Sequence, residues 1–332
     1  MLVLSHDEVA AALAPEECAA AMAEVLAAHA RGETFMPLRT TMKPPDAAGI
    51  MGLMPAWRGE SGQWQGVFSL KAICVIPANP GRGLDAHQGV VVLFDADTGV
   101  PLAILDASAV TAVRTAAVSA VATDLLARED ASVLAILGGG VQAHSHLNAL
   151  LRVREFEAVR VYAPTHEHAH AVIDSIERTR AAGTLVAEAA ASARDAVSGA
   201  DVVVAATNSL TPVLELDWLA AGCHVNAVGA STPSARELTA ETVAASALFA
   251  DSRESLENEA GEYREALRLG LIGEDHVRAE LGEVLAGLAP GRRDDREITL
   301  FRSLGLAVED LAAAQHAVRA AARLGLGTEV HL

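Results

Sequence analysis

The sequence predicts an α/β protein in which a doubly wound parallel sheet follows an N-terminal α+β domain. From residue 133 onward, short apolar runs alternate with helical patterns, which is the rhythm of βαβ units. The run over 133–137 is apolar without alternation and leads into Gly138-Gly139-Gly140, as expected of a strand buried on both faces. Residues 34–106 instead carry short β-like pieces separated by Pro, Gly and Asp, which predicts an antiparallel or mixed sheet.

The individual elements are expected in the following order. A capping box at 5–8 opens a short helix, and a second helix begins at Pro15 and ends at Gly32. A hairpin turns at 97–99, and a helix covers 108–127. The remaining expectations are β-like pieces near 36–43, 49–54, 66–76, 88–95 and 101–105, parallel strands near 133–137, 158–162, 184–188, 201–206, 223–228 and 247–250, and a last helix at about 307–324.

Composition limits the classes of partner. The formal net charge of −18 argues against nucleic acid and anionic membranes. No apolar run reaches the length of a membrane span, and the first residues lead into a helix start without a signal-peptide pattern. The three cysteines, Cys18, Cys74 and Cys223, are far apart and have neither disulfide nor metal spacing. A reducing cytoplasm is therefore the expected location.

The glycines after the first parallel strand predict a dinucleotide site. Gly138-x-Gly140-x-x-Ala143 joins a strand to a helix start, where glycine lets the backbone approach a pyrophosphate and the helix N-terminus supplies N–H groups. Alone this motif is weak, because a tight glycine turn in another α/β protein has the same pattern.

Lysine is rare in the chain. Of 25 basic residues, only Lys43 and Lys71 are lysines. Arginine stays protonated near neutral pH, whereas lysine can release a proton. Lys71 lies in the apolar segment VFSLKAICVI, where strict alternation places it on the face of Ser69 and Ile73. Burial would lower its pKa and make it a candidate proton donor, although a lysine on the solvent face of an edge strand has the same pattern.

Several segments together resemble the ornithine cyclodeaminase/mu-crystallin family. They occur in order along nearly the whole chain: LMPAW (53–57), FSLKAI (68–73), AHQGVVVLFDADTGVPLAILDAS (86–108), TAVRTAAVSAVAT (111–123), ILGGGVQAHSH (136–146), HVNAVGAS (224–231) and SLGLAVEDLAAA (303–314). The resemblance implies a domain for substrate binding and dimerisation over 1–118, completed by a C-terminal helix at about 305–332. It implies a Rossmann domain for a nicotinamide cofactor over 119–304, and a homodimer.

Two positions bear on the branch of the family. The cyclodeaminase pattern has Glu before Leu-Met-Pro, where it handles the distal amino group of ornithine, and this chain has Gly52. The same pattern has Asp for proton transfer after Val-Gly-Gly, and this chain has Ser231 after Val-Gly-Ala. A neutral hydroxyl is a poor general base without a partner. The resemblance is therefore to the mu-crystallin-like ketimine reductase branch.

The expected substrate-binding residues are Arg39, Lys71, His87, Arg114 and Ser231, with Lys71 also the expected catalytic residue. Arginine binds a carboxylate bidentately, and a desolvated site strengthens the contact. Arg114 lies mid-helix among apolar residues, where a charge needs a partner. A structural ion pair with an acid such as Asp106 is the alternative for Arg114, and a structural role is the alternative for Arg39 and His87.

The cofactor is expected to be NADP or NAD, with NADP slightly favoured. The second nucleotide strand ends in Ala163-Pro164, so the acid that binds the ribose of NAD is absent. Thr165 remains from the pattern that binds a 2′-phosphate, but the arginine is missing, so His166 or His168 would have to help. The expected cofactor-binding residues are Thr115, Gly138, Gly140, Val141, Gln142, Thr165, Ala206, Thr207, Val228 and Gly229.

No metal site is expected. His166, His168 and His170 alternate, so on a helix their side chains spread around the axis. The predicted function is NAD(P)H-dependent reduction of a small ketimine bearing a carboxylate, of the Δ1-pyrroline-2-carboxylate or Δ1-piperideine-2-carboxylate type. The alternatives are an ornithine cyclodeaminase, an L-alanine-type amino-acid dehydrogenase, and a protein that holds the cofactor without turnover. The partner is a small imino or amino acid.

Overall fold

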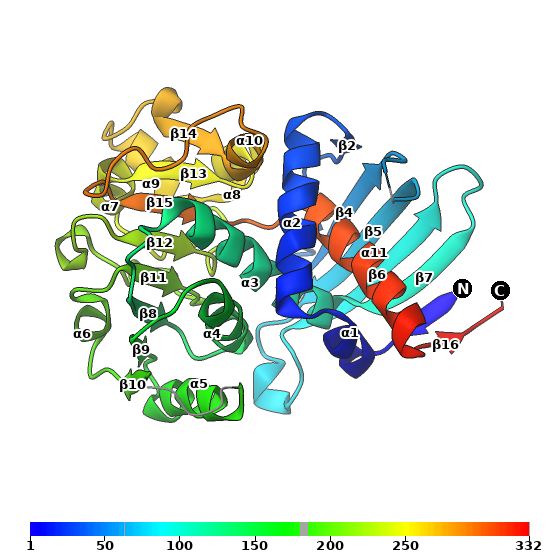
Figure 1. Cartoon of the computed structure of the whole chain (residues 1–332), viewed down its shortest axis with the longest axis horizontal. Helices are drawn as coiled ribbons and strands as arrows, with labels where there is room; N and C mark the ends of the chain where they lie inside the picture. Colours follow the sequence, from blue (N-terminus) through cyan, green and yellow to red (C-terminus); the bar gives the residue numbers. More distant parts are fainter. Residues whose placement is uncertain (63, 180–184, 332) are drawn as a thin grey trace. The chain divides into compact units, whose positions relative to one another are not determined.

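The chain forms two compact units in the computed structural model, which describes residues 1–62, 64–179 and 185–331. One unit comprises residues 1–114 and 305–332, and the other comprises residues 115–304 (Figure 1). The boundary lies inside helix α3 (Ala107–Leu126), as does the boundary expected from sequence at residue 118. By length and composition alone α3 could cross a membrane, but 72% of its apolar window is buried inside the protein. One such helix is weak evidence for a span, because core helices share these properties.

The unit of residues 1–114 and 305–332 is built on a mixed sheet. Its strand order is β16-β1-β7-β6-β5-β4-β2, with β3 also paired to β4. Strand β1 runs parallel to β7, and the other described pairs are antiparallel. The elements are β1 (Leu2–Leu4), α1 (His6–Ala12), α2 (Pro15–Ala30), β2 (Thr34–Phe35), β3 (Thr40–Met42), β4 (Ile50–Arg58), β5 (Val67–Val75), η1 (Pro80–Arg82), β6 (His87–Asp95), β7 (Pro101–Asp106), α11 (Ala307–Leu324) and β16 (Thr328–Glu329).

The two faces of this mixed sheet differ. Along β5 the residues alternate between buried and partly exposed, as expected of a strand with one covered face. Helix α11 packs against β4, β5 and β6, and α2 packs on α11 (Figure 1). We call the covered face the inner face; it carries Lys71. The opposite, outer face is apolar but only half-buried or exposed; it carries Met51, Leu53, Trp57, Phe68, Leu70, Cys74, Val90, Val92, Phe94, Leu102 and Ile104.

The unit of residues 115–304 is built on a parallel sheet. Within its described residues the strand order is β10-β9-β8-β11-β12-β15-β13-β14, and every pair is parallel. The elements are β8 (Val133–Leu137), α4 (Val141–Val153), β9 (Ala158–Tyr162), α5 (His166–Thr179), β10 (Val186–Ala189), α6 (Ala193–Val197), β11 (Val202–Ala205), η2 (Leu216–Trp218), β12 (His224–Ala227), α7 (Ala240–Ala245), β13 (Ala247–Ala250), α8 (Arg253–Glu259), α9 (Gly261–Arg268), η3 (Glu274–His276), β14 (Val277–Glu280), α10 (Leu281–Leu285) and β15 (Thr299–Arg302).

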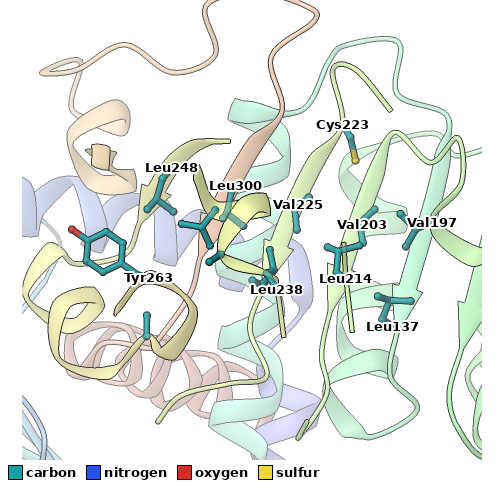
Figure 2. Packing of buried hydrophobic residues seen from close by; sticks show 14 of the residues in the cluster. Leu137, Val197, Val203, Leu214, Cys223, Val225, Leu238, Leu248, Tyr263 and Leu300 are labelled. Carbon is teal, nitrogen blue, oxygen red and sulfur yellow. The ribbon is translucent and has the colours of Figure 1, made fainter. Parts of the chain in front are cut away.

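Cores on both faces of this parallel sheet explain why β8 and β11 are continuously apolar. All four residues of β11 are buried. Val203 and Val225 belong to one core with Leu214, Leu238 and Leu300 (Figure 2), while Val202 and Val204 belong to a second core with β8 and β9. A strand covered on both sides has no polar face to show alternation.

The predicted doubly wound sheet and the preceding mixed sheet are confirmed. The predicted list of strands was incomplete, because it omitted β14 and β15, which extend the parallel sheet, and the short β1 and β16. Their signals are weak: β14 is only four residues, Val-Arg-Ala-Glu, and carries two charges. Residue 184, at the start of one predicted strand, lies outside the described residues.

Candidate active site

Lys71 is buried at the centre of the inner face. It lies on β5 opposite Met54 and Val91 and is only 3% exposed, so the alternative of a solvent-facing lysine is wrong. Its Nζ lies 2.7 Å from Oδ2 of Asp310 and 3.5 Å from Oγ1 of Thr111. The ammonium therefore has an acid partner from α11 and a hydroxyl from α3.

The pKa of Lys71 is lowered to about 8, chiefly by burial and also by the nearby cations Arg114 and Arg39. The negative charge of Asp310 opposes this shift and is already included in that value. For Asp310 itself, burial would raise the pKa, but Lys71 and Arg114 hold it below its usual range. Asp310 is thus a carboxylate at neutral pH, while Lys71 is poised to release its proton near that pH.

Arg114 is paired to two acids of α11. Its Nη1 donates to Glu309 at 2.9 Å, and its Nε donates to Asp310 at 3.0 Å. The alternative of a structural ion pair for Arg114 is therefore confirmed, but its partners are Glu309 and Asp310 rather than an acid such as Asp106. Asp106 instead accepts from the backbone N–H of Ala109, at the start of α3. The real partners are 195 and 196 residues away in sequence, so only the fold reveals them.

Gly305 lies against both arginines. Its carbonyl accepts a hydrogen bond of 2.9 Å from Nη2 of Arg39. Its φ of +81° favours glycine, and an added Cβ would lie 2.7 Å from Nη2 of Arg114. A side chain at residue 305 would therefore displace the Arg114 guanidinium.

We call Arg39, Lys71, Arg114, Glu309 and Asp310 the substrate cluster. It holds three cations and two carboxylates. Glu309 and Asp310 are missing from the sequence-based assignment, as are Thr111 and Gly305. Two adjacent acids at the start of an otherwise apolar helix, in SLGLAVEDLAAA, were the signal that could have indicated the first two.

His87 opens β6 on the same face as Lys71, opposite Val75, and its side chain reaches the surface. The surrounding protein lowers its pKa, and the charges of Lys71 and Arg114 lower it further. Its imidazole is therefore neutral at pH 7. Ser231, also expected to bind substrate, is exposed in the unit of residues 115–304. Its role stays a prediction.

The glycine turn after β8 fits a dinucleotide. Gly138 has φ of +133°, and an added Cβ would lie 2.4 Å from the carbonyl oxygen of Ala206. A Cβ added to Gly140 meets nothing within 4 Å, so the backbone there is open to a ligand. Gly140 is also the N-cap of α4, where no side-chain cap is described. Open glycine backbone at an uncapped helix N-terminus is suited to a pyrophosphate.

The other predicted cofactor residues lie around the carboxyl edge of the parallel sheet or in α3. Ala206 and Thr207 follow β11, and Val228 and Gly229 follow β12. Val141 and Gln142 open α4, Thr165 is exposed before α5, and Thr115 is buried in α3. Glu237, which the sequence-based assignment missed, accepts hydrogen bonds from both Thr207 and Gly229.

Within the described part of the chain, the histidines do not converge on a metal site. His166 and His170 lie one turn apart on α5 with ring centroids separated by 6.0 Å. His146 is buried and bonded to Ser119 and to the Gln142 carbonyl, and burial lowers its pKa to about 4. Among the residues that the structure describes, no three potential metal ligands are grouped.

The comparison with known families shows which family the chain belongs to. Residues 1–323 match the model of the ornithine cyclodeaminase/mu-crystallin family. The chain belongs to this family. Over 331 residues it is 35% identical to the Delta(1)-pyrroline-2-carboxylate reductase of Bacillus cereus (strain ZK / E33L), covering 99% of each chain. Over 284 residues it is 36% identical to the ketimine reductase mu-crystallin of Mus musculus, covering 86% of this chain and 84% of the relative.

Solved members of the ornithine cyclodeaminase/mu-crystallin family share the whole fold. The Thermococcus litoralis Delta(1)-pyrroline-2-carboxylate reductase, in complex with NADH and L-proline, has a TM-score of 0.94 at 34% identity and covers 99% of this chain and 100% of its own. An archaeal alanine dehydrogenase dimer with bound NAD has a TM-score of 0.91 at 32% identity and covers 100% of this chain and 99% of its own. Both neighbours hold a nicotinamide cofactor.

Proposed function

We propose that this member of the family is an NAD(P)H-dependent reductase of small ketimines that bear a carboxylate. Δ1-Pyrroline-2-carboxylate and Δ1-piperideine-2-carboxylate are the intended substrate type. The observation that carries the proposal is a buried ammonium, Lys71, with a pKa of about 8 beside two arginines. Such a group can donate a proton where the arginines hold a carboxylate. When bound, the reduced nicotinamide supplies the hydride.

The residues of the substrate cluster have separate tasks. Arg39 and Arg114 bind the substrate carboxylate, and Gly305 and Glu309 hold these guanidinium groups in place. Lys71 gives its proton to the imine nitrogen, so that the C=N bond becomes CH–NH once the carbon has received hydride. Asp310, 2.7 Å from the Lys71 ammonium, fixes its direction and stays ionised throughout.

Charge balance favours a substrate with one carboxylate. The cluster already holds two carboxylates, Glu309 and Asp310, beside its three cations. A second substrate carboxylate would bring a further negative charge into this desolvated site, and burial of a charge without a partner of its own is strongly unfavourable. Pyruvate with ammonia is therefore expected to be reduced faster than oxaloacetate with ammonia.

Ornithine is expected to be a poor substrate. Gly52 lies on the inner face of β4, where it pairs with Ile73, two residues along β4 from the pair Met54–Lys71. A Cβ added there meets nothing closer than 3.6 Å, so the space does not force glycine at this position. An uncharged position beside the Lys71 ammonium offers no acid for a distal amino group. The apolar ring of a cyclic imine therefore suits the space beside Gly52 better than the charged side chain of ornithine.

The test is a spectrophotometric assay of the purified protein at the nicotinamide absorbance. The panel contains both cyclic imines, pyruvate or oxaloacetate with ammonia, L-alanine, L-proline and ornithine. Reduction of the cyclic imines with the highest kcat/KM supports the proposal. Ammonia release from ornithine at a comparable rate contradicts it in favour of a cyclodeaminase. Tight NADH binding without any turnover favours the non-catalytic alternative.

For the cofactor we infer that NADPH is accepted, with a slight preference over NADH. Ala163 and Pro164 end β9 without an acid that would repel a 2′-phosphate, and Thr165, His166 and His168 are exposed beside them. The neighbours with bound NAD or NADH show that the family also uses the unphosphorylated cofactor. The ratio of kcat/KM for NADPH and NADH tests the inference, and a ratio well below one contradicts it.

We infer that two copies of the chain associate through the outer face of the mixed sheet. Phe68 pairs with Trp57 and Phe94 across three strands, and Phe68 is 48% exposed. An exposed apolar face of this kind marks an interface, and a related solved protein is a dimer. Phe68→Asp should yield monomers in light scattering, whereas Val100→Asp, in the β6–β7 turn, should not. A monomeric wild type contradicts the inference.

A further inference from the structure

Glu237 is a fully buried acid in the unit of residues 115–304, with an exposed fraction of 0%. Its two carboxylate oxygens receive four hydrogen bonds. Oε1 accepts from the N–H of Thr207 at 2.6 Å and from its hydroxyl at 2.8 Å. Oε2 accepts from the N–H of Gly229 at 2.6 Å and of Ala230 at 3.2 Å. One side chain therefore satisfies three backbone donors that no strand pairs.

These donors belong to two different loops. Thr207 lies in the loop after β11, and Gly229 lies in the loop after the neighbouring strand β12. The loops approach so closely that a Cβ on Gly229 would lie 1.9 Å from the Thr207 carbonyl oxygen. Glu237 therefore fixes the main chain of both loops against each other.

Glu237 is itself held from the protein core. Its carbonyl oxygen accepts from the N–H groups of Val213 and Leu214 at 2.8 and 3.0 Å. The next residue, Leu238, forms a β-bridge with Leu214, and both leucines are buried in the core shown in Figure 2. The carboxylate is thus presented from a rigid base rather than from a mobile loop.

The surrounding groups have opposing effects on the pKa of Glu237. Burial raises its pKa to about 7, while Arg302 and the hydrogen bonds from Thr207 oppose this shift, and Glu262 adds to it. Arg302 is anchored by its own bond of 2.7 Å to the Ala227 carbonyl and by Glu262 at 2.5 Å. Because every group facing the two oxygens is a donor, the geometry suits a carboxylate and not an amide.

The two loops lie where one half of a dinucleotide is expected. From β8 the chain continues to β9 and β10 on one side of the sheet, whereas β11 and β12 lie on the other side of β8. The order in which strands are added therefore reverses between β8 and β11. In doubly wound sheets a dinucleotide crosses this point with its pyrophosphate at the glycine turn. The adenosine half then lies toward β9, and the nicotinamide half lies toward β11 and β12.

We propose that Glu237 is a positioning residue for the nicotinamide half of the cofactor, acting by holding the loops after β11 and β12 in their binding conformation. This proposal rests on the proposed use of a nicotinamide cofactor. The adenosine half contacts the glycine turn and the region after β9, which Glu237 does not touch. Loss of the carboxylate should therefore weaken the nicotinamide contribution to binding and spare the adenosine contribution.

The test compares NADH with ADP-ribose, which lacks the nicotinamide, on purified full-length protein. Glu237→Gln keeps the shape but turns an NH2 group toward backbone donors. Asp201→Asn is the matched control, because Asp201 lies in the same unit and its Oδ2 also accepts from two backbone N–H groups, those of Ser132 and Val133 at 2.9 and 3.0 Å, at the start of β11 rather than in either loop. Dissociation constants come from NADH fluorescence and from calorimetry with ADP-ribose, and thermal unfolding is followed for each variant.

For Glu237→Gln we expect the Kd of NADH to rise ~10-fold or more, the scale of charge-assisted hydrogen bonds lost at a rigid site, with the Kd of ADP-ribose within about twofold. Asp201→Asn should leave the Kd of NADH and the Kd of ADP-ribose unchanged even where it lowers the melting temperature. An unchanged NADH affinity in Glu237→Gln, or equal loss for both ligands, overturns the proposal. Should Glu237→Gln not fold, Glu237→Asp, which is too short to reach both loops, must show the same selective loss. A wild type that binds neither ligand instead refutes the proposed cofactor use.

Discussion

Replacement of Lys71 tests whether it transfers a proton or only binds. Lys71→Met removes the charge and keeps most of the length, while Lys71→Arg keeps the charge but cannot release a proton near neutral pH. If Lys71 is the proton donor, both variants should lower kcat by ~10²-fold or more, the usual scale of general acid catalysis. This corresponds to about 2.7 kcal/mol in the activation free energy. If Lys71 only binds carboxylate, Arg should retain most of kcat and mainly raise KM.

The structure shows why these variants should fold. Removing one partner of a buried ion pair costs about 3–5 kcal/mol when the other charge is stranded. Asp310 is not stranded, because it keeps its hydrogen bond of 3.0 Å from Arg114. Lys71→Met also removes one positive charge from the substrate cluster, so its KM for the imino acid should rise as well. Cofactor affinity should not change, because the glycine turn belongs to the other unit.

Lys43, the other lysine of the chain, provides the control. It is exposed, so Lys43→Met makes the same chemical change without touching the cluster and should leave kcat and KM unaltered. The assay is steady-state imine reduction at saturating cofactor, with NADH fluorescence to confirm binding in each variant. Full kcat in Lys71→Met would refute the reasoning. Lys71 would then be structural, and the proton would come from water or from Ser231.

Three further predictions concern the same sites. Because the pKa of Lys71 is about 8, kcat/KM for reduction should be flat below that pH and fall above it. Asp310→Asn removes the acid that raises this pKa, so it should move the falling limb of the pH profile to lower pH. A falling limb that does not move would argue against Lys71 as the titrating group. Gly138→Val should abolish nicotinamide binding in a protein with unchanged circular dichroism, because its Cβ would meet the Ala206 carbonyl at 2.4 Å, and surviving affinity would contradict the assigned site. Gly305→Ala should raise KM for the imino acid ~10-fold by displacing Arg114, with the Kd of NADH unchanged; equal effects on both ligands would indicate general unfolding.

The features that short-range sequence patterns determine, such as buried strands and their covered faces, were predicted correctly. The uninterrupted apolar run before Gly138 indicated a doubly covered strand, and alternation around Lys71 indicated the buried face on which it lies. The strand β14 was missed because two of its four residues are charged and its pairing partner β13 begins 30 residues earlier. Periodicity needs more residues than so short a strand provides.

The partners of the buried cations could not be predicted, because they depend on pairing between distant segments. The helical context of Arg114 indicated that an acid must be near, and Asp106 was the nearest in sequence. A short side chain at the start of a helix, however, can satisfy the helix's own N–H groups, and Asp106 does so at Ala109. Choosing Glu309 over Asp106 requires knowing that α11 packs on β4, β5 and β6.

The acids supplied by α11 also explain how Lys71 and Arg114 can be buried with the half-buried Arg39 in one cluster. Three positive charges without counter-charges would be strongly disfavoured in a desolvated site, and complete neutralisation would leave no attraction for an anionic substrate. Glu309 and Asp310 supply negative charge beside Lys71 and Arg114. Burial and the neighbouring arginines lower the pKa of Lys71, and the negative charge of Asp310 opposes that shift. A bound carboxylate would add a further negative charge and raise the pKa of Lys71, so the ammonium would be most fully protonated when the imine is in place.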